Sequence, residues 1–448
     1  MWEDRVLGAF ANAFKTPDLR RKILFVLFIV VIFRIGSVVP APGVNVQSLH
    51  TCIKISQGGA NANLYNLINL FSGGALLQLA IFALGIMPYI TASIILQLLT
   101  VVIPRLESLK KEGQAGQAKI TQYTRFLTVG LAILQSTAFV ALARTPGRLF
   151  QGCTEPLLYK DDWFTISVMV LTMTAGTGVI MWLGELITDR GVGNGMSILI
   201  FTQIVATFPT QLWSIRKQKG VATFVVVIAI GLVIMAAVIF IEQAQRRIPV
   251  QYAKRMVGRK MFGGTSTYIP LKVNQAGVIP VIFASSLLYI PQLAISLFGN
   301  QAHPQGWVSW VQRYLEVGNS SDLSTMWLYL GAFFVLIVAF TFFYVSITFN
   351  PTEVADNMKK YGGFVPGIRP GRPTAEYLGY VLNRLTTPGS LYLGVVALFP
   401  LIALAVIGVG NQFPFSGVSL LIMVGVGLDT VKQIESQLQQ RNYEGFLR

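Results

Sequence analysis

The sequence is poor in charged residues and in the side chains that bind metal ions. Only 12% of its 448 residues are Asp, Glu, Lys or Arg, and it has two cysteines and two histidines. No Cys or His residues have the spacing of a metal site, and the glycine-rich run 191–195 lacks the Lys-Ser/Thr of a phosphate-binding loop. No Ser–His or Asp–Asp combination lies in an apolar segment. We therefore expect no metal, no cofactor and no enzymatic activity.

The sequence is instead rich in long apolar runs. The chain is 53% hydrophobic with a mean hydropathy of +0.60, values that exclude a soluble protein of this size. At ~20 residues per membrane-spanning helix, the sequence predicts an all-α integral membrane protein with ten transmembrane helices. The predicted spans are 23–39, 75–102, 126–143, 164–186, 196–208, 221–241, 276–298, 327–349, 390–409 and 418–431.

The basic residues are unevenly divided between the predicted loops. With both termini in the cytoplasm, 26 of the 35 Lys and Arg residues lie in inside segments and 8 in outside segments. Because cytoplasmic loops carry the excess of Lys and Arg, this orientation is the predicted one. Residues 1–22, with an apolar stripe from Trp2 to Phe14, predict an amphipathic helix on the inner membrane face, and residues 437–448 a cytoplasmic tail.

A short run of residues occurs twice. The run from Gly85 to Ser93 returns 192 positions later, from Gly277 to Ser285, with Gly, Pro, Ile, Ala and Ser at the same offsets. Gly and Pro interrupt a membrane helix only where protein or water satisfies the freed backbone groups, and paired interruptions indicate a path between two halves. All five residue types are common in membrane helices, so chance recurrence is the alternative.

An odd number of predicted spans separates the two copies, so they cross the membrane in opposite senses. The chain then divides into two pseudo-symmetric inverted halves, residues 23–215 and residues 216–436. Ile90 and Ile282 share one offset in the repeat, which places them at similar depth and able to form an apolar constriction. Simple packing is the alternative for either isoleucine. Few charges lie in the spans, and Arg34, Glu185 and Asp429 are expected to be paired or to reach the membrane surface.

A third feature is a helical face too short to cross the membrane. Leu64, Leu67, Ile68 and Phe71 follow the i, i+3, i+4, i+7 spacing, and the flexible residues Gly73 and Gly74 come next. We expect a re-entrant helix at 64–74 that enters from the outside. An interfacial helix would explain the apolar face but not the hinge.

Two inside loops, 242–273 and 350–380, are basic and each is too small for a hydrophobic core of its own. The first predicts a β-hairpin that turns near Gly263-Gly264, and the second frames Arg369 with Pro and Gly, which fixes a loop tip. Basic loops often only set topology, but a rigid arginine suits docking to an acidic partner or an RNA backbone. The docking candidates are Arg246, Arg247, Lys254, Arg255 and Arg369.

The two cysteines, Cys52 and Cys153, fall in predicted outside loops. A disulfide is chemically permitted there. Because the sequence gives no distance between them, two free thiols are the favoured expectation.

Several strings along almost the whole chain resemble the SecY/Sec61α family of protein-conducting channels. They are the runs 71–75, 82–90, 181–185, 190–195, 245–248, 252–255 and 364–371. The resemblance implies a ten-helix channel in a bacterial plasma membrane whose halves close around a central pore. It implies a pore ring of Ile86, Ile90, Ile200, Ile282 and Ile422, a plug at 64–74, and a lateral gate with the polar residues Gln97, Thr124 and Asn274.

The resemblance also implies partners. These are the SecE and SecG subunits, the SecA motor ATPase, the ribosome, signal sequences and nascent chains, together with anionic membrane lipid. Two other hypotheses are an inverted-repeat secondary transporter for a small solute and a membrane-integral scaffold. The transporter hypothesis lacks the intramembrane charges that such proteins use and leaves the basic loops unexplained.

Overall fold

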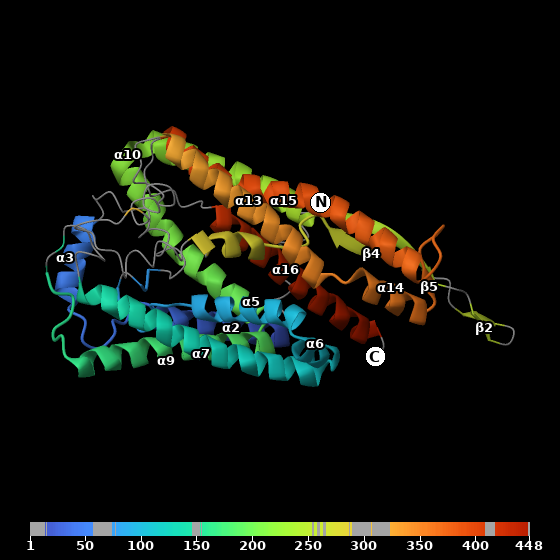
Figure 1. Cartoon of the computed structure of the whole chain (residues 1–448), viewed down its shortest axis with the longest axis horizontal. Coiled ribbons are helices and arrows are strands. Elements are labelled where there is room, and N and C mark those ends of the chain that lie inside the picture. The colour runs from blue at the N-terminus through green and yellow to red at the C-terminus, as the bar shows by residue number, and fades with distance from the viewer. Residues whose placement is uncertain are drawn as a thin grey trace.

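The computed structural model covers the chain as a bundle of long helices with a small sheet at one end (Figure 1). It describes residues 14, 16–56, 74–76, 78–145, 153, 155–252, 255–257, 260–262, 266–285, 287–288, 306, 323–407 and 417–446. Residues 1–13 and 15 of the predicted amphipathic helix and residues 64–73 of the predicted re-entrant helix lie outside the described residues.

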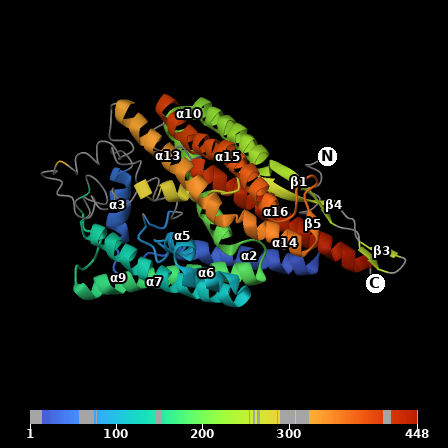
Figure 2. The same cartoon turned by 45° about the vertical axis from the view of Figure 1, so that its right-hand side comes forward.

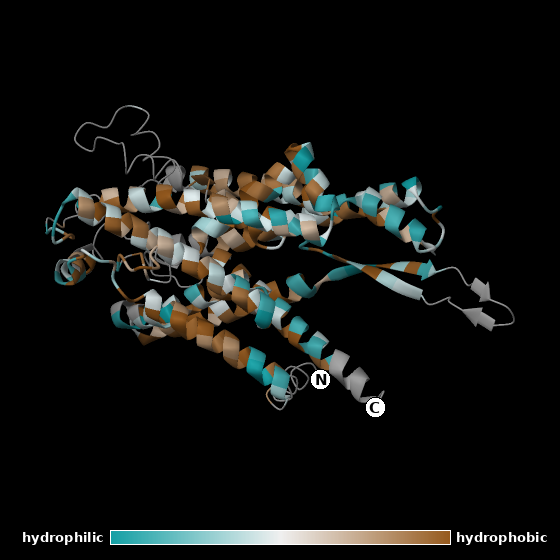
Figure 3. Ribbon diagram, turned by 90° about the horizontal axis from the view of Figure 1, so that it is seen from below, coloured by the Kyte–Doolittle hydropathy of each residue, from teal (hydrophilic) through white to brown (hydrophobic). Residues whose placement is uncertain are grey.

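The predicted fold class, an all-α multipass membrane protein, is confirmed. Among the described helices, six are long and apolar enough to cross a membrane, and their apolar residues fill the middle of the bundle (Figure 3). The helices are α2 (Pro17–Gly36), α3 (Val46–Ser56), α5 (Met87–Val102), α6 (Pro104–Lys111), α7 (Gln114–Arg144), α9 (Trp163–Arg190), α10 (Gly195–Gln243), α13 (Leu323–Thr348), α14 (Pro351–Lys360), α15 (Arg372–Ile407) and α16 (Gly417–Phe446).

The buried face of α7 shows how these helices pack inside a membrane. Every fourth residue from Gly116 to Val140 is buried, and this stripe consists of small, hydroxyl-bearing and aliphatic side chains. Thr124 and Thr128 donate their hydroxyls to carbonyls one turn earlier, so neither hydroxyl is left unpaired in the apolar interior. Small residues let helix backbones approach closely, while larger side chains such as Phe126 and Leu134 stay exposed toward lipid.

The helices form two packed groups. In one group α2, α5 and α7 pack with α9, and in the other α13 packs on α15 and α15 on α16 (Figure 1). Helix α10 lies between the groups and consists of two helical segments, Gly195–Lys217 and Gly220–Gln243, which meet at a kink at Gly220, where φ is 87°. The predicted separation of two spans in this region therefore takes the form of a kink.

Both copies of the repeat begin with the same backbone break. Gly85 has φ 56° and Gly277 has φ 62°, and a helix starts two residues after each, at Met87 and at residue 279. The first amide bonds match as well: the Ile90 amide donates to the Ile86 carbonyl at 3.1 Å, and the Ile282 amide to the Val278 carbonyl at 3.3 Å. The expected continuous span from residue 75 is wrong, because residues 78–86 form turns before α5 begins.

A three-stranded sheet stands at one end of the bundle. Strands β1 (Gln245–Tyr252) and β4 (Ser266–Lys272) form the predicted hairpin, and β5 (Gly363–Phe364), from the second basic loop, pairs with the far end of β1 (Figure 2). At the tip, β2 (Arg255–Val257) pairs with β3 (Lys260–Phe262). The chain therefore reverses between β2 and β3, not at Gly263-Gly264 as expected.

The two basic loops share a hydrophobic core. Ile248, Val250 and Leu271 from the hairpin pack against Val365 and against residues of α14 and α15. Neither loop has a core of its own, but the sheet joins the two loops and they bury one cluster together. We call β1, β4, β5, α14 and the loop 365–371 the platform.

The described ends of the chain lie on the same side of the bundle. Leu19 of α2, Val192 in the turn between α9 and α10, and Ile434 of α16 pack together, and Lys22 donates to Gln437 at 3.5 Å. The residues assigned to a tail continue α16 as far as Phe446.

The two cysteines form a disulfide between Cys52 of α3 and Cys153. Both side chains are buried. Backbone bonds from Asn45 to Leu157 and from Tyr159 to Gly43 hold the two segments side by side. The expectation of free thiols is wrong, because these tertiary contacts supply the proximity that the sequence does not encode locally.

Removal of the disulfide is expected to destabilise the protein. Because the bridge closes a loop with a sequence separation of 101, its loss should cost about 2–5 kcal/mol of unfolding free energy. Thermal unfolding in detergent, with and without reductant, measures the effect in wild type and in the Cys52→Ser/Cys153→Ser double variant. Reductant should lower the Tm of wild type alone. An equal drop in the double variant would show that the reductant acts elsewhere.

Candidate pore and gate

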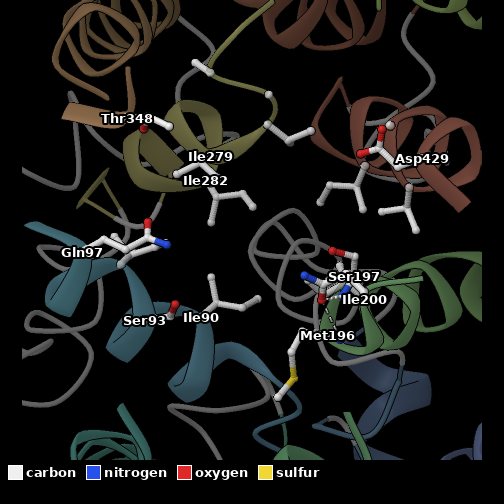
Figure 4. Close-up of a pocket in the computed structure, with 18 of the residues that line it drawn as sticks. Ile90, Ser93, Gln97, Met196, Ser197, Ile200, Ile279, Ile282, Thr348 and Asp429 are labelled. Carbon is white, nitrogen blue, oxygen red and sulfur yellow. Dashed lines mark hydrogen bonds between the residues drawn. The ribbon is translucent and has the colours of Figure 1, made fainter. Parts of the chain in front are cut away.

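A cavity of about 730 Å³ lies between the two copies of the repeat. Ile90 of α5, Ile200 of α10, Ile282 of the second copy and Ile422 of α16 all line it. In Figure 4, Ile90, Ile200 and Ile282 point toward the same space from three separate elements. Four of the five predicted ring residues therefore come together although they are far apart in the sequence.

Ile86, the fifth predicted ring residue, lies elsewhere. Its side chain is 1% exposed and packs with Phe33, Ile180 and Leu199 in the core of the first half. It occupies the last position before α5, where the turn after Gly85 directs it away from the cavity lining. The prediction that Ile86 lines the pore is not supported by this placement.

The predicted gate residues lie near one another without forming one hydrogen-bonded cluster. Gln97 lines the main cavity and also an adjoining cavity of about 240 Å³, which Thr124 lines and Asn274 does not. Thr124 donates to the Ile120 carbonyl, and the Asn274 bonds go to Glu242 and Gly277. No hydrogen bond among the described residues joins Gln97, Thr124 and Asn274 to one another. The smaller cavity lies between α5, α7 and the end of α13, beside the second copy.

The inner part of the main cavity carries charges of both signs, and two ion pairs neutralise several of them. Arg125 of α7 donates twice to the Glu185 carboxylate, at 2.7 and 2.9 Å, and Lys272 lies 3.6 Å from Asp429. The expectation that Glu185 and Asp429 are paired is confirmed. Their partners were not predicted, because they come from other helices or from the hairpin.

Glu242 is the site residue that sequence reasoning missed. It stands at the end of α10, lines the cavity, and accepts a 2.5 Å hydrogen bond from the Asn274 amide. The same amide donates to the Gly277 carbonyl at 3.3 Å. A signal was present: a carboxylate ends an apolar run immediately before the basic hairpin, and such a carboxylate requires a partner.

The platform presents most of the predicted docking arginines. Arg246, Arg247 and Arg369 are exposed, and Arg247 lies over the Tyr268 ring at 4.8 Å. Arg255 lies in β2 at the tip, and Lys254 lies outside the described residues.

The loop that carries Arg369 has a defined conformation. Ile368 donates its amide to the Val365 carbonyl at 3.0 Å across Pro366-Gly367, and Gly367 has φ 84°. Proline at the second position and a glycine with positive φ at the third are the features of a type II turn. The Arg369 carbonyl also accepts from the Thr374 hydroxyl, which anchors the base of the loop and confirms the predicted rigid tip.

Comparison with known proteins identifies the group to which this architecture belongs. The SecY family model matches residues 80–431. The chain belongs to the SecY family. The protein translocase subunit SecY of Streptomyces scabiei is 65% identical over 99% of this chain and 100% of its own length. That of Mycobacterium bovis is 60% identical over the same shares.

Solved structures agree with this fold. A protein-conducting channel has a TM-score of 0.63 at 19% identity, covering 93% of this chain and 91% of its own. Sec61 in the canine ribosome–channel complex has a TM-score of 0.60 at the same identity and coverage. The expected function, a channel subunit of protein translocation, is confirmed at the level of the family. None of these relatives supports the small-solute transporter hypothesis.

The positive φ of Gly277 gives a testable expectation. A Cβ at Gly277 would meet no atom within 4 Å, so the Gly277→Ala cost comes from φ alone and should be about 1 kcal/mol of stability. Gly178→Ala in α9 is the control, because it also has free space but a helical backbone. Thermal unfolding in detergent should show a lower Tm for Gly277→Ala and an unchanged or higher Tm for Gly178→Ala. Equal shifts would contradict the backbone assignment.

Proposed function

We propose that this chain forms the pore through which unfolded polypeptides cross the membrane. The observation that carries the proposal is the cavity lined from both copies of the repeat, with four isoleucines converging on it. Ile282 and Ile422 belong to the hydrophobic cluster of the second half, and Ile90 and Ile200 pack against it. The constriction therefore lies where the two halves meet, so a small separation of the halves would widen it.

An apolar ring suits the passage of a polypeptide. Branched aliphatic side chains exclude water and impede ions by dewetting, yet they form no strong bond to a passing chain. We propose the ring as Ile90, Ile200, Ile282 and Ile422, and segment 64–74 as a plug that backs it. Several charges in this cavity are paired, Arg125 with Glu185 and Lys272 with Asp429. The electric field of these pairs is therefore too weak to hold back a charged segment of a passing polypeptide.

We propose the lateral gate between α5 and the second copy of the repeat, beside the smaller cavity. Gln97 and Thr124 line that cavity together with Ser93, Thr121 and Thr348, and Asn274 lines the main one, so polar residues line the proposed gate. Such contacts contribute only ~0.6–2 kcal/mol each in a membrane. A signal sequence or a transmembrane segment that prefers the lipid boundary could therefore open the seam and pass sideways into the bilayer.

We propose that the platform docks the ribosome and the SecA motor, and that SecE and SecG complete the channel in a bacterial plasma membrane. The exposed arginines of the platform support docking to anionic surfaces, including RNA phosphate and anionic lipid. The packing of Leu19, Val192 and Ile434 on one side, with the basic excess of the inside segments, supports cytoplasmic termini. The channel needs no catalytic residue and no cofactor in this proposal, because the motor or the ribosome supplies the driving force.

Photo-crosslinking from the ring tests the proposed path. A crosslinking residue at Ile90, and separately at Ile282, should react with a radiolabelled secretory chain stalled in transit. A crosslinker at Leu134, which faces lipid from α7, is the control and should give no product with a fully inserted secretory chain. Absence of crosslinks from both isoleucines with an engaged substrate would place the path elsewhere. Normal transport after both isoleucines become Asn would favour the scaffold hypothesis.

Charge reversal at the loop tip tests the docking role. Arg369→Glu should abolish motor-driven export without unfolding the protein, because the exposed tip then repels an acidic partner. Export into vesicles measures the loss, and thermal unfolding verifies the fold. Lys360→Glu, an exposed position in α14, makes the same change of charge in the same loop and should retain most export. Export at the wild-type rate in Arg369→Glu would remove the docking hypothesis.

A further inference from the structure

The segments that lead into the two copies of the repeat are held by different kinds of contact. Three residues before the glycine, the first copy has Phe82 and the second has Asn274. Phe82 is buried and stacks on Phe33 at a centroid distance of 5.9 Å. Backbone bonds from Ala41 to Leu79 and from Ile81 to Val39 fix the approach to the first copy. The first copy is thus anchored in an apolar core.

The helix of the second copy also packs in an apolar cluster, with Val281 and Ala284 buried, but the turn that leads into it is held by polar groups beside the cavity. The Asn274 amide donates to the Glu242 carboxylate at 2.5 Å and to the Gly277 carbonyl at 3.3 Å. Gly277 is half-buried and has open space where a side chain would be, so the turn after Asn274 has room to move. The helix that begins at residue 279 carries Ile282 into the cavity.

Glu242 and Asn274 stand at the two ends of the platform hairpin. Glu242 lies in the last turn of α10, before β1, and Asn274 follows β4. The Val273 amide donates to the Ala244 carbonyl at 3.1 Å, which closes the hairpin next to this pair. A displacement of the platform would therefore move the Asn274 side chain and the Gly277 turn. The Val273–Ala244 and Asn274–Glu242 hydrogen bonds connect them to the platform.

We propose that Glu242 and Asn274 form a latch through which the position of the platform sets the position of Ile282 in the cavity. The Gly277 turn moves with the platform and shifts the helix that carries Ile282, whereas the segment before Gly85 stays fixed by its apolar contacts and backbone bonds. Glu242 is a positioning residue: it acts through Asn274 and touches no passing chain in this proposal. The inference rests on the proposed pore function and assigns to it the element that couples docking to opening.

A charge-assisted hydrogen bond suits a latch. It is stronger than a neutral bond and has defined geometry, so it keeps the second copy aligned with the platform. The same cavity is also lined by Lys272, Asp429 and Lys432. When the bond to Asn274 breaks, the Glu242 carboxylate therefore remains in polar surroundings. An apolar contact such as that of Phe82 is spread over many atoms, so the two segments that it joins cannot be separated by the loss of one bond.

A double-mutant cycle on ion leak tests the latch without any partner. Glu242→Leu, Asn274→Leu and the double variant are reconstituted in phosphatidylethanolamine–phosphatidylglycerol vesicles, and anion leak is measured. Each single variant should raise the leak, the double variant should raise it no further, and Glu242→Gln, which keeps an acceptor, should stay near wild type. Glu107→Leu, at an exposed carboxylate of α6, is the matched control and should not leak.

Three outcomes of the cycle would overturn the latch. They are an unchanged leak in both single variants, single effects that multiply in the double variant, and a Glu242→Gln leak equal to that of Glu242→Leu. Thermal unfolding of each variant shows whether a leak comes from loss of the fold. If the leucine variants unfold, the leak of Glu242→Gln relative to wild type still tests the latch.

The response to docking gives a second, separable readout. Saturating empty ribosomes should increase the leak of wild type and of Glu242→Gln, whereas Glu242→Leu should bind ribosomes equally well and lose the increase. A full increase in Glu242→Leu would overturn the coupling. If ribosomes do not bind to wild-type vesicles, the proposed docking is contradicted. The double-mutant cycle on ion leak would still test whether Glu242 and Asn274 form a latch.

Discussion

The structure depends on one constraint: every backbone amide and carbonyl at membrane depth must find a partner. Two segments meet this constraint with non-helical backbone, around Gly85 and Gly277, where φ is positive and a helix begins two residues later. Strand-like bonds to residues 39 and 41 satisfy the backbone before the first break, and the Ala244–Val273 bond and the Asn274 amide satisfy it around the second. Protein or cavity must surround each of these non-helical segments. The two segments lie on either side of the main cavity, and the isoleucines that follow them, Ile90 and Ile282, both line it.

The remainder of the bundle follows from how helices associate without a hydrophobic driving force. Lipid tails are as apolar as leucine, so close backbone packing and hydroxyl bonds, as along α7, hold neighbouring helices together. Large side chains such as Phe126 remain outside. Charges reach membrane depth where a partner from another helix neutralises them, as Arg125 does for Glu185. These pairs stand in the cavity wall, which is the part of the bundle that water can reach.

The platform gives the two halves unequal roles. Both basic loops come from the second half, and their strands and α14 share one core, so a load on either loop acts on one body. That body joins the second copy of the repeat through the hairpin ends. The first copy has no such connection in the described part of the chain, because Phe82 and Ile86 lie in the apolar cluster around Phe33. Pseudo-symmetry of sequence therefore coexists with an asymmetry of attachment.

The sequence by itself determined the membrane class, the approximate place of most long helices, the repeat and the turn at Arg369, because hydropathy, Gly/Pro placement and charge distribution are local signals. It also identified Ile90, Ile200, Ile282 and Ile422 through resemblance. Tertiary structure alone decided that Ile86 leaves the cavity, that Cys52 meets Cys153, that two loops share a core, and that Glu242 bonds to Asn274. Each of these depends on which distant segments pack side by side, and a periodicity of a few residues carries no information about contacts across 30 to 100 positions.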